Sequence, residues 1–178
     1  MKAERTRKPR PPLDAEGLER LGLFYAGRYA TTRSRFAAYL VRKLRERGWS
    51  GAGEPPVEAL VERFAGLGYV DDRAFGTARA ASLMRRGYGE RRVDRALQAA
   101  GIAGEEAEPA RAAAREEAFA AALRFAERRR LGPFAEAALD WEARRKAAGA
   151  MLRAGHRIDI VRRVLDASPG EVPDPDSF

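Results

Sequence analysis

The sequence contains no cysteine and a single histidine, His156. The absence of cysteine excludes disulfides, thiolate metal ligands and a cysteine nucleophile, and one histidine alone leaves a histidine-based zinc site without partners. No apolar run approaches the ~20 residues of a membrane span, and the basic, polar residues 1–5 are not followed by the apolar stretch of a secretion signal. We therefore expect a cytoplasmic protein that holds no metal or other cofactor and does not enter the membrane.

Lysine is also scarce, because only four of the 34 basic residues are lysines and the other 30 are arginines. The net charge is nevertheless +8, with an isoelectric point near 10.4. This balance favours polyanionic partners, nucleic acid first, and arginine suits the forked contact with phosphate. A chain rich in alanine and arginine also fits a bias in genome composition, so charge alone does not decide the function.

Signatures of catalysis are missing as well. The glycine-rich segment Gly51-Ala52-Gly53 has neither the preceding strand nor the following lysine of a phosphate-binding loop, and no nucleophile stands in a pattern with a base. The pair Asp71-Asp72 comes between a helix-ending glycine and a new helix, where a carboxylate caps free N–H groups. We favour this cap over paired catalytic or metal-binding carboxylates and predict that the protein is not an enzyme.

Apolar residues recur at helical spacing through most of the chain, and no segment alternates as a strand does. Ser34 is a candidate N-cap of the second helix, and Glu105 to Arg130 is expected to form two helices that meet near Arg115. Helices are predicted over 14–30, from 34 to Gly48, from Pro55-Pro56 to Gly68, from Asp71-Asp72 to Gly87, from about 93 to Gly101, over 105–130, over 138–154 and over 159–167.

Three of the helix ends repeat, because Gly48, Gly101 and Gly155 are 53 and 54 residues apart and each follows a large apolar residue by four positions. This spacing predicts an all-α protein of three tandem three-helix modules in an elongated arrangement. The predicted organisation is a disordered basic tail (1–13), module 1 (14–70), module 2 (71–114), module 3 (115–167) and an acidic, proline-rich tail (168–178).

The most distinctive stretch is Gly68-Tyr69-Val70-Asp71-Asp72-Arg73-Ala74-Phe75, followed by Arg86-Gly87 and by the helix Arg91 to Ile102. It resembles the RecX family, which has a glycine–aromatic–aliphatic–Asp-Asp element and a second-module helix ending in glycine–isoleucine. The resemblance covers about residues 18–166. This sequence departs from the family pattern at Ala37, where an acidic residue is usual, at His156, where phenylalanine is usual, and in a longer loop over 51–56.

The resemblance implies a regulatory protein that binds in the groove of the RecA–DNA filament and modulates, most often inhibits, its recombinase and coprotease activities. It thus implies a place in DNA recombination, DNA repair and the SOS response, with RecA and single- or double-stranded DNA as partners, and we expect a monomer. Two alternatives stay open: a DNA-binding protein made of helix-turn-helix-like three-helix modules, and a scaffold repeat protein whose arginines only solvate its surface.

Basic side chains crowd corresponding helices of the three modules, so a modular row would line them along one polyanion-binding surface. A solvated helix face explains them equally well, since cations near helix C-termini are favourable anyway. The candidate filament- and nucleic-acid-binding residues are Arg42, Lys43, Arg45, Arg47, Arg85, Arg86, Arg91, Arg92, Arg95, Arg144, Arg145, Lys146, Arg153, Arg157, Arg162 and Arg163.

Four ring-bearing residues follow turn glycines. Trp49, Tyr69 and Tyr88 fit base stacking, but packing against their own module is the favoured interpretation. His156 is likewise expected to pack rather than to catalyse.

Overall fold

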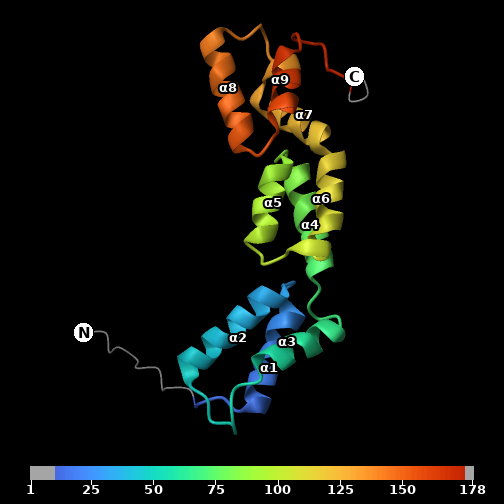
Figure 1. Cartoon of the computed structure of the whole chain (residues 1–178). Helices are drawn as coiled ribbons and strands as arrows, with labels where there is room; N and C mark the ends of the chain where they lie inside the picture. The colour runs from blue at the N-terminus through green and yellow to red at the C-terminus, as the bar shows by residue number, and fades with distance from the viewer. Residues whose placement is uncertain (1–10, 175–178) are drawn as a thin grey trace, which may run out of the picture. The chain divides into compact units, whose positions relative to one another are not determined.

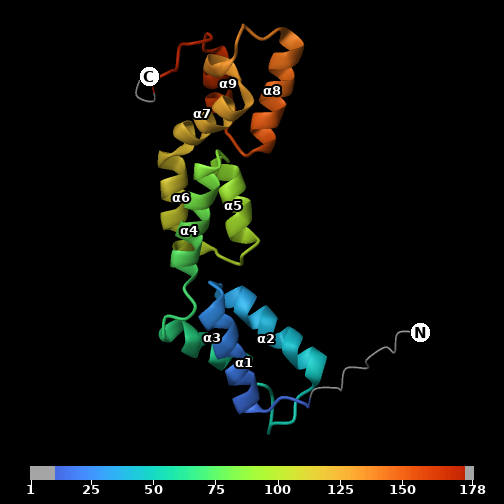
Figure 2. The same ribbon diagram turned by 180° about the vertical axis from the view of Figure 1, so that it is seen from behind.

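The computed structural model describes residues 11–174, which form two compact units, unit 1 up to Asp72 and unit 2 from Arg73. These residues contain nine α-helices, one short 3₁₀ helix and no strand, apart from an isolated bridge between Leu13 and Trp49. The all-α prediction is therefore confirmed (Figures 1 and 2). No helix in the described part is both long and apolar enough to span a membrane. Residues 1–10 of the tail predicted over 1–13, and residues 175–178 of the tail predicted over 168–178, lie outside the described residues.

Unit 1 is a three-helix assembly around the N-terminal cluster of apolar residues. Phe36, Leu40 and Phe64 are almost fully buried in it, and the Phe36 and Phe64 ring centroids are 5.0 Å apart. The helices are α1 (Ala15–Arg28), α2 (Arg33–Arg47) and α3 (Val57–Gly66).

Helix α2 begins earlier than the sequence predicts. Thr32, not Ser34, is the N-cap, and its hydroxyl oxygen accepts a hydrogen bond from the Arg35 amide at 3.2 Å. Thr32 is fully buried whereas Ser34 is exposed in the first turn. Both residue types cap well, so the tertiary environment decides between them.

The ordered fold also extends into both predicted tails. Leu13 is 1% exposed, its amide donates to the Gly48 carbonyl at 3.0 Å, and its carbonyl accepts from the Ser50 amide at 2.9 Å. At the other end, the Gly170 amide donates to the Pro133 carbonyl at 2.8 Å. The predicted tail 1–13 therefore includes an apolar residue that completes the N-terminal cluster.

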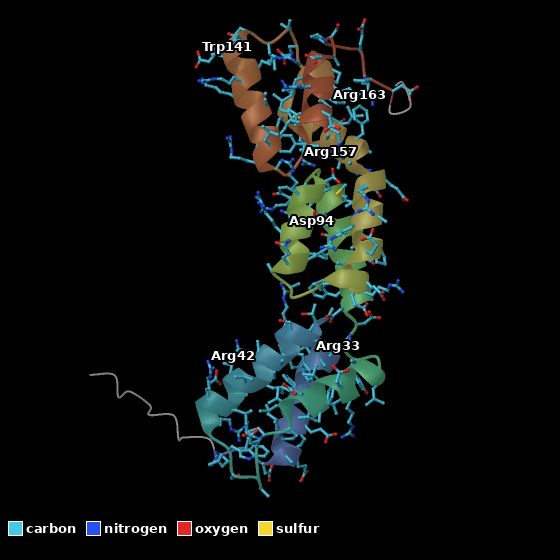
Figure 3. All side chains as sticks on the ribbon, in the orientation of Figure 1. Arg33, Arg42, Asp94, Trp141, Arg157 and Arg163 are labelled. Carbon is cyan, nitrogen blue, oxygen red and sulfur yellow. The ribbon has the colours of Figure 1, made fainter. Side chains whose placement is uncertain are left out.

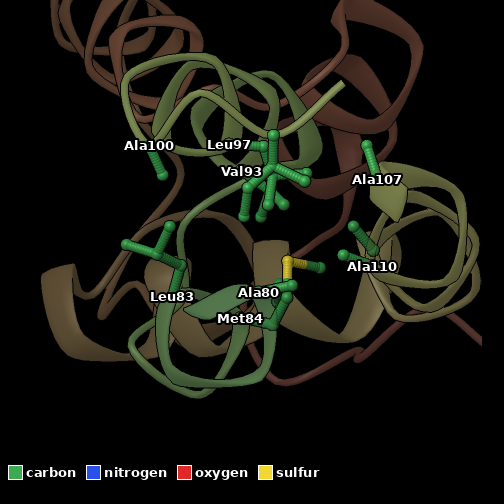
Figure 4. Packing of buried hydrophobic residues seen from close by; sticks show 11 residues of the cluster. Ala80, Leu83, Met84, Val93, Leu97, Ala100, Ala107 and Ala110 are labelled. Atoms are coloured by element: carbon green, nitrogen blue, oxygen red, sulfur yellow. The ribbon is translucent and has the colours of Figure 1, made fainter. Parts of the chain in front are cut away.

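Unit 2 contains two apolar clusters that share helix α7. The middle cluster joins α4, α5 and α6 around residues such as Leu97 (Figure 4), and the C-terminal cluster joins α7, α8 and α9 around residues such as Met151. Only Glu117 separates α6 from α7, so the predicted break near Arg115 is confirmed. The elements are α4 (Asp72–Arg85), α5 (Glu90–Gln98), α6 (Gly104–Glu116), α7 (Ala118–Arg129), the 3₁₀ helix η1 (Gly132–Phe134), α8 (Trp141–Arg153) and α9 (Ile158–Asp166).

The repeated glycines do end their helices in the left-handed region, with φ of +81° at Gly48, +74° at Gly101 and +98° at Gly155. At Gly101 and Gly155 the next residue's amide reaches back five residues, as in a Schellman motif: Ile102 bonds Leu97 and His156 bonds Met151. The three helix ends are therefore set by local sequence, while the division into three repeats stays a prediction.

Backbone hydrogen bonds join the helices of the middle cluster to those of the C-terminal cluster. The Gly89 amide donates to the Ala154 carbonyl at 3.0 Å, and the Arg91 amide donates to the Gly155 carbonyl at 3.1 Å. A Cβ at Gly89 would lie 2.4 Å from the Gly155 carbonyl carbon. This approach is open only to glycine.

His156 lies beside this junction and confirms the packing prediction. It is 1% exposed, its Nε2 is 3.1 Å from the Gly87 carbonyl oxygen, and its ring meets Phe125 edge-on at 5.5 Å. Burial lowers the pKa of His156 to about 4, against the opposing effect of the Gly87 hydrogen bond. The ring is therefore neutral near pH 7, with Nε2–H as donor and Nδ1 buried without a partner.

Candidate nucleic-acid and filament interface

The candidate basic residues of unit 1 lie on α2, and most of them are engaged within the unit. Lys43 and Arg42 both contact the Glu46 carboxylate, at 2.6 and 3.7 Å, and Arg47 donates to the Pro11 carbonyl at 2.9 Å. Arg45 is exposed and makes no ion pair or side-chain hydrogen bond to the described residues. Figure 3 shows Arg42 on the outer side of α2.

Several of the predicted residues in unit 2 form ion pairs or hydrogen bonds within the described chain. Arg144 donates to the Leu165 carbonyl at 2.6 Å and pairs with Asp166, so it caps the end of α9. Arg157 forms a two-bond pair with Asp159 at 3.0 to 3.1 Å.

Two further cations are also engaged. Arg163 lies over the Phe119 ring at 4.4 Å and donates to the Asp174 carbonyl. Lys146 pairs with Glu142 at 2.7 Å. Removing any of these charges would break a contact within unit 2.

A second group in unit 2 is exposed and forms no ion pair or side-chain hydrogen bond within the described chain: Arg85, Arg91, Arg95, Arg153 and Arg162. Arg91 and Arg95 are one turn apart on α5, and the buried Val93 and Leu97 define the opposite face of that helix. The one carboxylate between them, Asp94, is held by Arg111 of α6 at 3.0 Å. Their guanidinium groups therefore have no hydrogen-bond acceptor among residues 11–174.

Tyr88 extends this surface at the start of α5. The guanidinium carbons of Arg86 and Arg92 lie 5.3 and 5.1 Å from its ring centroid, and the ring packs against both apolar clusters of unit 2. The predicted anchoring role of Tyr88 fits these contacts. Cation–π contact holds the two arginines beside Arg91 while leaving their N–H donors unpaired. We call Arg86, Arg91, Arg92 and Arg95 the α5 basic face.

Helices α5 and α8 lie along one side of unit 2, opposite α6, in both views (Figures 1 and 2). Arg145 and Arg153 of α8 are exposed like the arginines of α5. The structure thus places the second helices of the predicted modules 2 and 3 on a common side.

Asp72 lies in the first turn of α4, as predicted, and is 7% exposed. Its carboxylate accepts from the Arg33 amide at 2.8 Å, so it also binds the N-terminus of a second helix, α2, 39 residues earlier. Among residues 11–174, no group of three histidine, cysteine or acidic side chains is placed to hold a metal.

Trp141, which the sequence analysis did not single out, is the most exposed of the large apolar residues described, at 74%. Figure 3 shows it at the start of α8. A signal was present in the sequence: Trp141 comes directly after the N-cap Asp140 and four residues before Arg145, outside the apolar stripe of Ala147 and Met151.

Residues 11–174 are helical and present exposed arginines along one side of unit 2, an arrangement that is typical of proteins that bind other macromolecules. Comparison with known proteins narrows this class. No family model matches the chain, but it is 31% identical over 166 residues to the regulatory protein RecX of Myxococcus xanthus strain DK1622, covering 85% of this chain and 86% of that protein. The crystal structure of RecX from Lactobacillus salivarius has the same fold, with a TM-score of 0.63, 17% identity, and coverage of 85% of this chain and 94% of that one.

The chain belongs to the RecX family and is a RecX-type regulatory protein. The resemblance inferred from residues 68–102 is confirmed.

Proposed function

We propose that this protein binds the RecA–DNA filament and inhibits the recombinase and coprotease activities of RecA, with the α5 basic face contacting DNA phosphates. The RecX-type sequence supports RecA as the partner. The observation that supports the phosphate contact is the pair Arg91 and Arg95, which are exposed, one turn apart and not paired with any carboxylate of residues 11–174. Such a role belongs to DNA recombination, DNA repair and the SOS response.

Unpaired arginines are better suited to this contact than paired ones. A guanidinium that already donates to a carboxylate must give up that bond before it binds phosphate, whereas Arg91 and Arg95 exchange only water. Each phosphate neutralised releases counterions. The logarithm of the binding constant for a single strand therefore falls with the logarithm of the salt concentration, with a slope of roughly −0.7 per contact. Losing two contacts should therefore lower both the affinity and the salt slope.

The test is RecA-catalysed ATP hydrolysis on single-stranded DNA, titrated with wild-type protein and with the double variant Arg91→Glu/Arg95→Glu. The control is Arg20→Glu/Arg130→Glu, which changes the net charge equally. Both control arginines are exposed and paired with a surface carboxylate, Glu16 at 2.8 Å and Glu136 at 2.8 Å, and such pairs contribute little to stability. Affinity for DNA without RecA is measured in parallel.

We expect the wild type and the control to inhibit hydrolysis at concentrations well below those that coat the DNA, and the α5 variant to need at least about tenfold more protein. Inhibition that begins only when the DNA is saturated would indicate a DNA-binding protein that acts by competition. Equal inhibition by the α5 variant and the control would show that the α5 basic face is only a solvated surface.

A further inference from the structure

The two tryptophans of the chain have opposite environments. Trp49 is built into unit 1: its indole N–H donates to the Gly53 carbonyl at 2.9 Å, and a Cβ at Gly51 would lie 2.3 Å from its ring. Trp141 is 74% exposed on unit 2 and contributes to neither apolar cluster there. Since tryptophan is the largest apolar side chain and normally gains by burial, packing within the chain does not explain Trp141.

The surroundings of Trp141 are cationic. The Arg145 guanidinium carbon lies 5.2 Å from the indole centroid, and Arg145, Gly149 and Arg153 continue from Trp141 at four-residue intervals along α8, over about 18 Å. Gly149 has no side chain and meets only the Arg153 guanidinium, at 3.2 Å from a Cβ built there.

The acidic neighbours of Trp141 are occupied. The Asp140 carboxylate accepts from the Ala143 amide at 2.8 Å, and Glu142 pairs with Lys146 at 2.7 Å. Arg145 and Arg153 form no ion pair or side-chain hydrogen bond within the described residues. The stripe from Trp141 to Arg153 therefore offers an aromatic face beside unpaired positive charge.

A ligand that suits both groups has a flat ring next to an anion. We infer that Trp141 stacks on an unpaired base of single-stranded DNA while Arg145 and Arg153 contact the flanking phosphates. Stacking on an indole needs a free base face, which a paired base inside a duplex does not offer. This inference rests on the proposed function, since it assigns the DNA-binding side of the same protein, and it adds a preference for single strands that arginine–phosphate contacts alone do not give.

The test separates base from phosphate by using two fluorescently labelled oligonucleotides of equal length, about 20 nucleotides, one of thymidines and one entirely abasic. Both carry the same phosphates, so they differ only in the presence of bases. Binding is measured by anisotropy for the wild type, Trp141→Ala, Trp141→Phe and the α5 variant Arg91→Glu/Arg95→Glu. Because Trp141 is exposed, replacing it should leave the helical circular dichroism unchanged.

We expect the wild type to prefer the thymidine strand by about tenfold, Trp141→Ala to lose that preference, and Trp141→Phe to keep most of it. The α5 variant should weaken binding to both strands and keep the preference, which makes a failure of the phosphate contact distinguishable from a failure of stacking. A preference that persists in Trp141→Ala, or none in the wild type, would overturn the inference. A Trp141→Ala variant that loses RecA inhibition but keeps the base preference would also overturn it, by placing the indole against protein.

Discussion

Stability should fall with acid because His156 is buried as a neutral ring. Its pKa is lowered by burial to about 4 from an ordinary value of 6.5. The unfolded chain therefore takes up the proton first as the pH falls, and the free energy of unfolding decreases between pH 6.5 and 4. Above pH 6.5 the stability is intact, and below pH 4 the loss is complete.

The size of this effect follows from the two pKa values. The full difference between the two pKa values corresponds to roughly 3 kcal/mol in the free energy of unfolding, and about 2 kcal/mol of this is lost between pH 7 and pH 4.5. Surface carboxylates also begin to titrate near the lower pH, so the wild-type change alone does not isolate His156. The variant His156→Phe provides the reference, because it retains a ring beside Phe125 and removes the titrating group.

Urea denaturation at both pH values, with amide hydrogen exchange in α5 and α8 to report on unit 2, measures the difference. Between pH 7 and pH 4.5, we expect the free energy of unfolding of the wild type to fall by about 2 kcal/mol more than that of His156→Phe. At pH 7 the variant gives up the hydrogen bond to Gly87, at a cost of about 1 kcal/mol. Equal losses in the two proteins would refute the conclusion that the buried ring is neutral in the folded state.

Two further predictions concern side chains or glycines that contact backbone groups of another helix. Gly89→Ala should destabilise unit 2 by several kcal/mol, because its Cβ would lie 2.4 Å from the Gly155 backbone, whereas Gly27→Ala, which meets nothing within 4 Å, should be neutral or stabilising in thermal denaturation. Asp72→Ala should lower the stability of unit 1 by about 1–3 kcal/mol, because the Arg33 amide at the start of α2 loses its buried acceptor. Full stability of Asp72→Ala in urea would exclude that role.

Much of the helical framework was predictable because its signals are local. The glycines at 101 and 155 end their helices through hydrogen bonds that reach back five residues, and the break between α6 and α7 fell within two residues of Arg115. The N-cap of α2 was the exception, since Thr32 and Ser34 are both good caps and only burial distinguishes them.

The candidate site was predictable as a set of residues but not as a surface. The sequence by itself determined which segments carry clustered arginines, because helical spacing alone puts these side chains outside the apolar stripe. Only the tertiary structure decided which of them are engaged: Arg144 binds the end of a helix about 20 residues away, whereas Arg91 and Arg95 form no ion pair or side-chain hydrogen bond in the part of the chain that the structure describes. Trp141 and Trp49 differ in exposure for the same reason. Exposure depends on which distant residues pack around a side chain, and a local sequence pattern does not predict it.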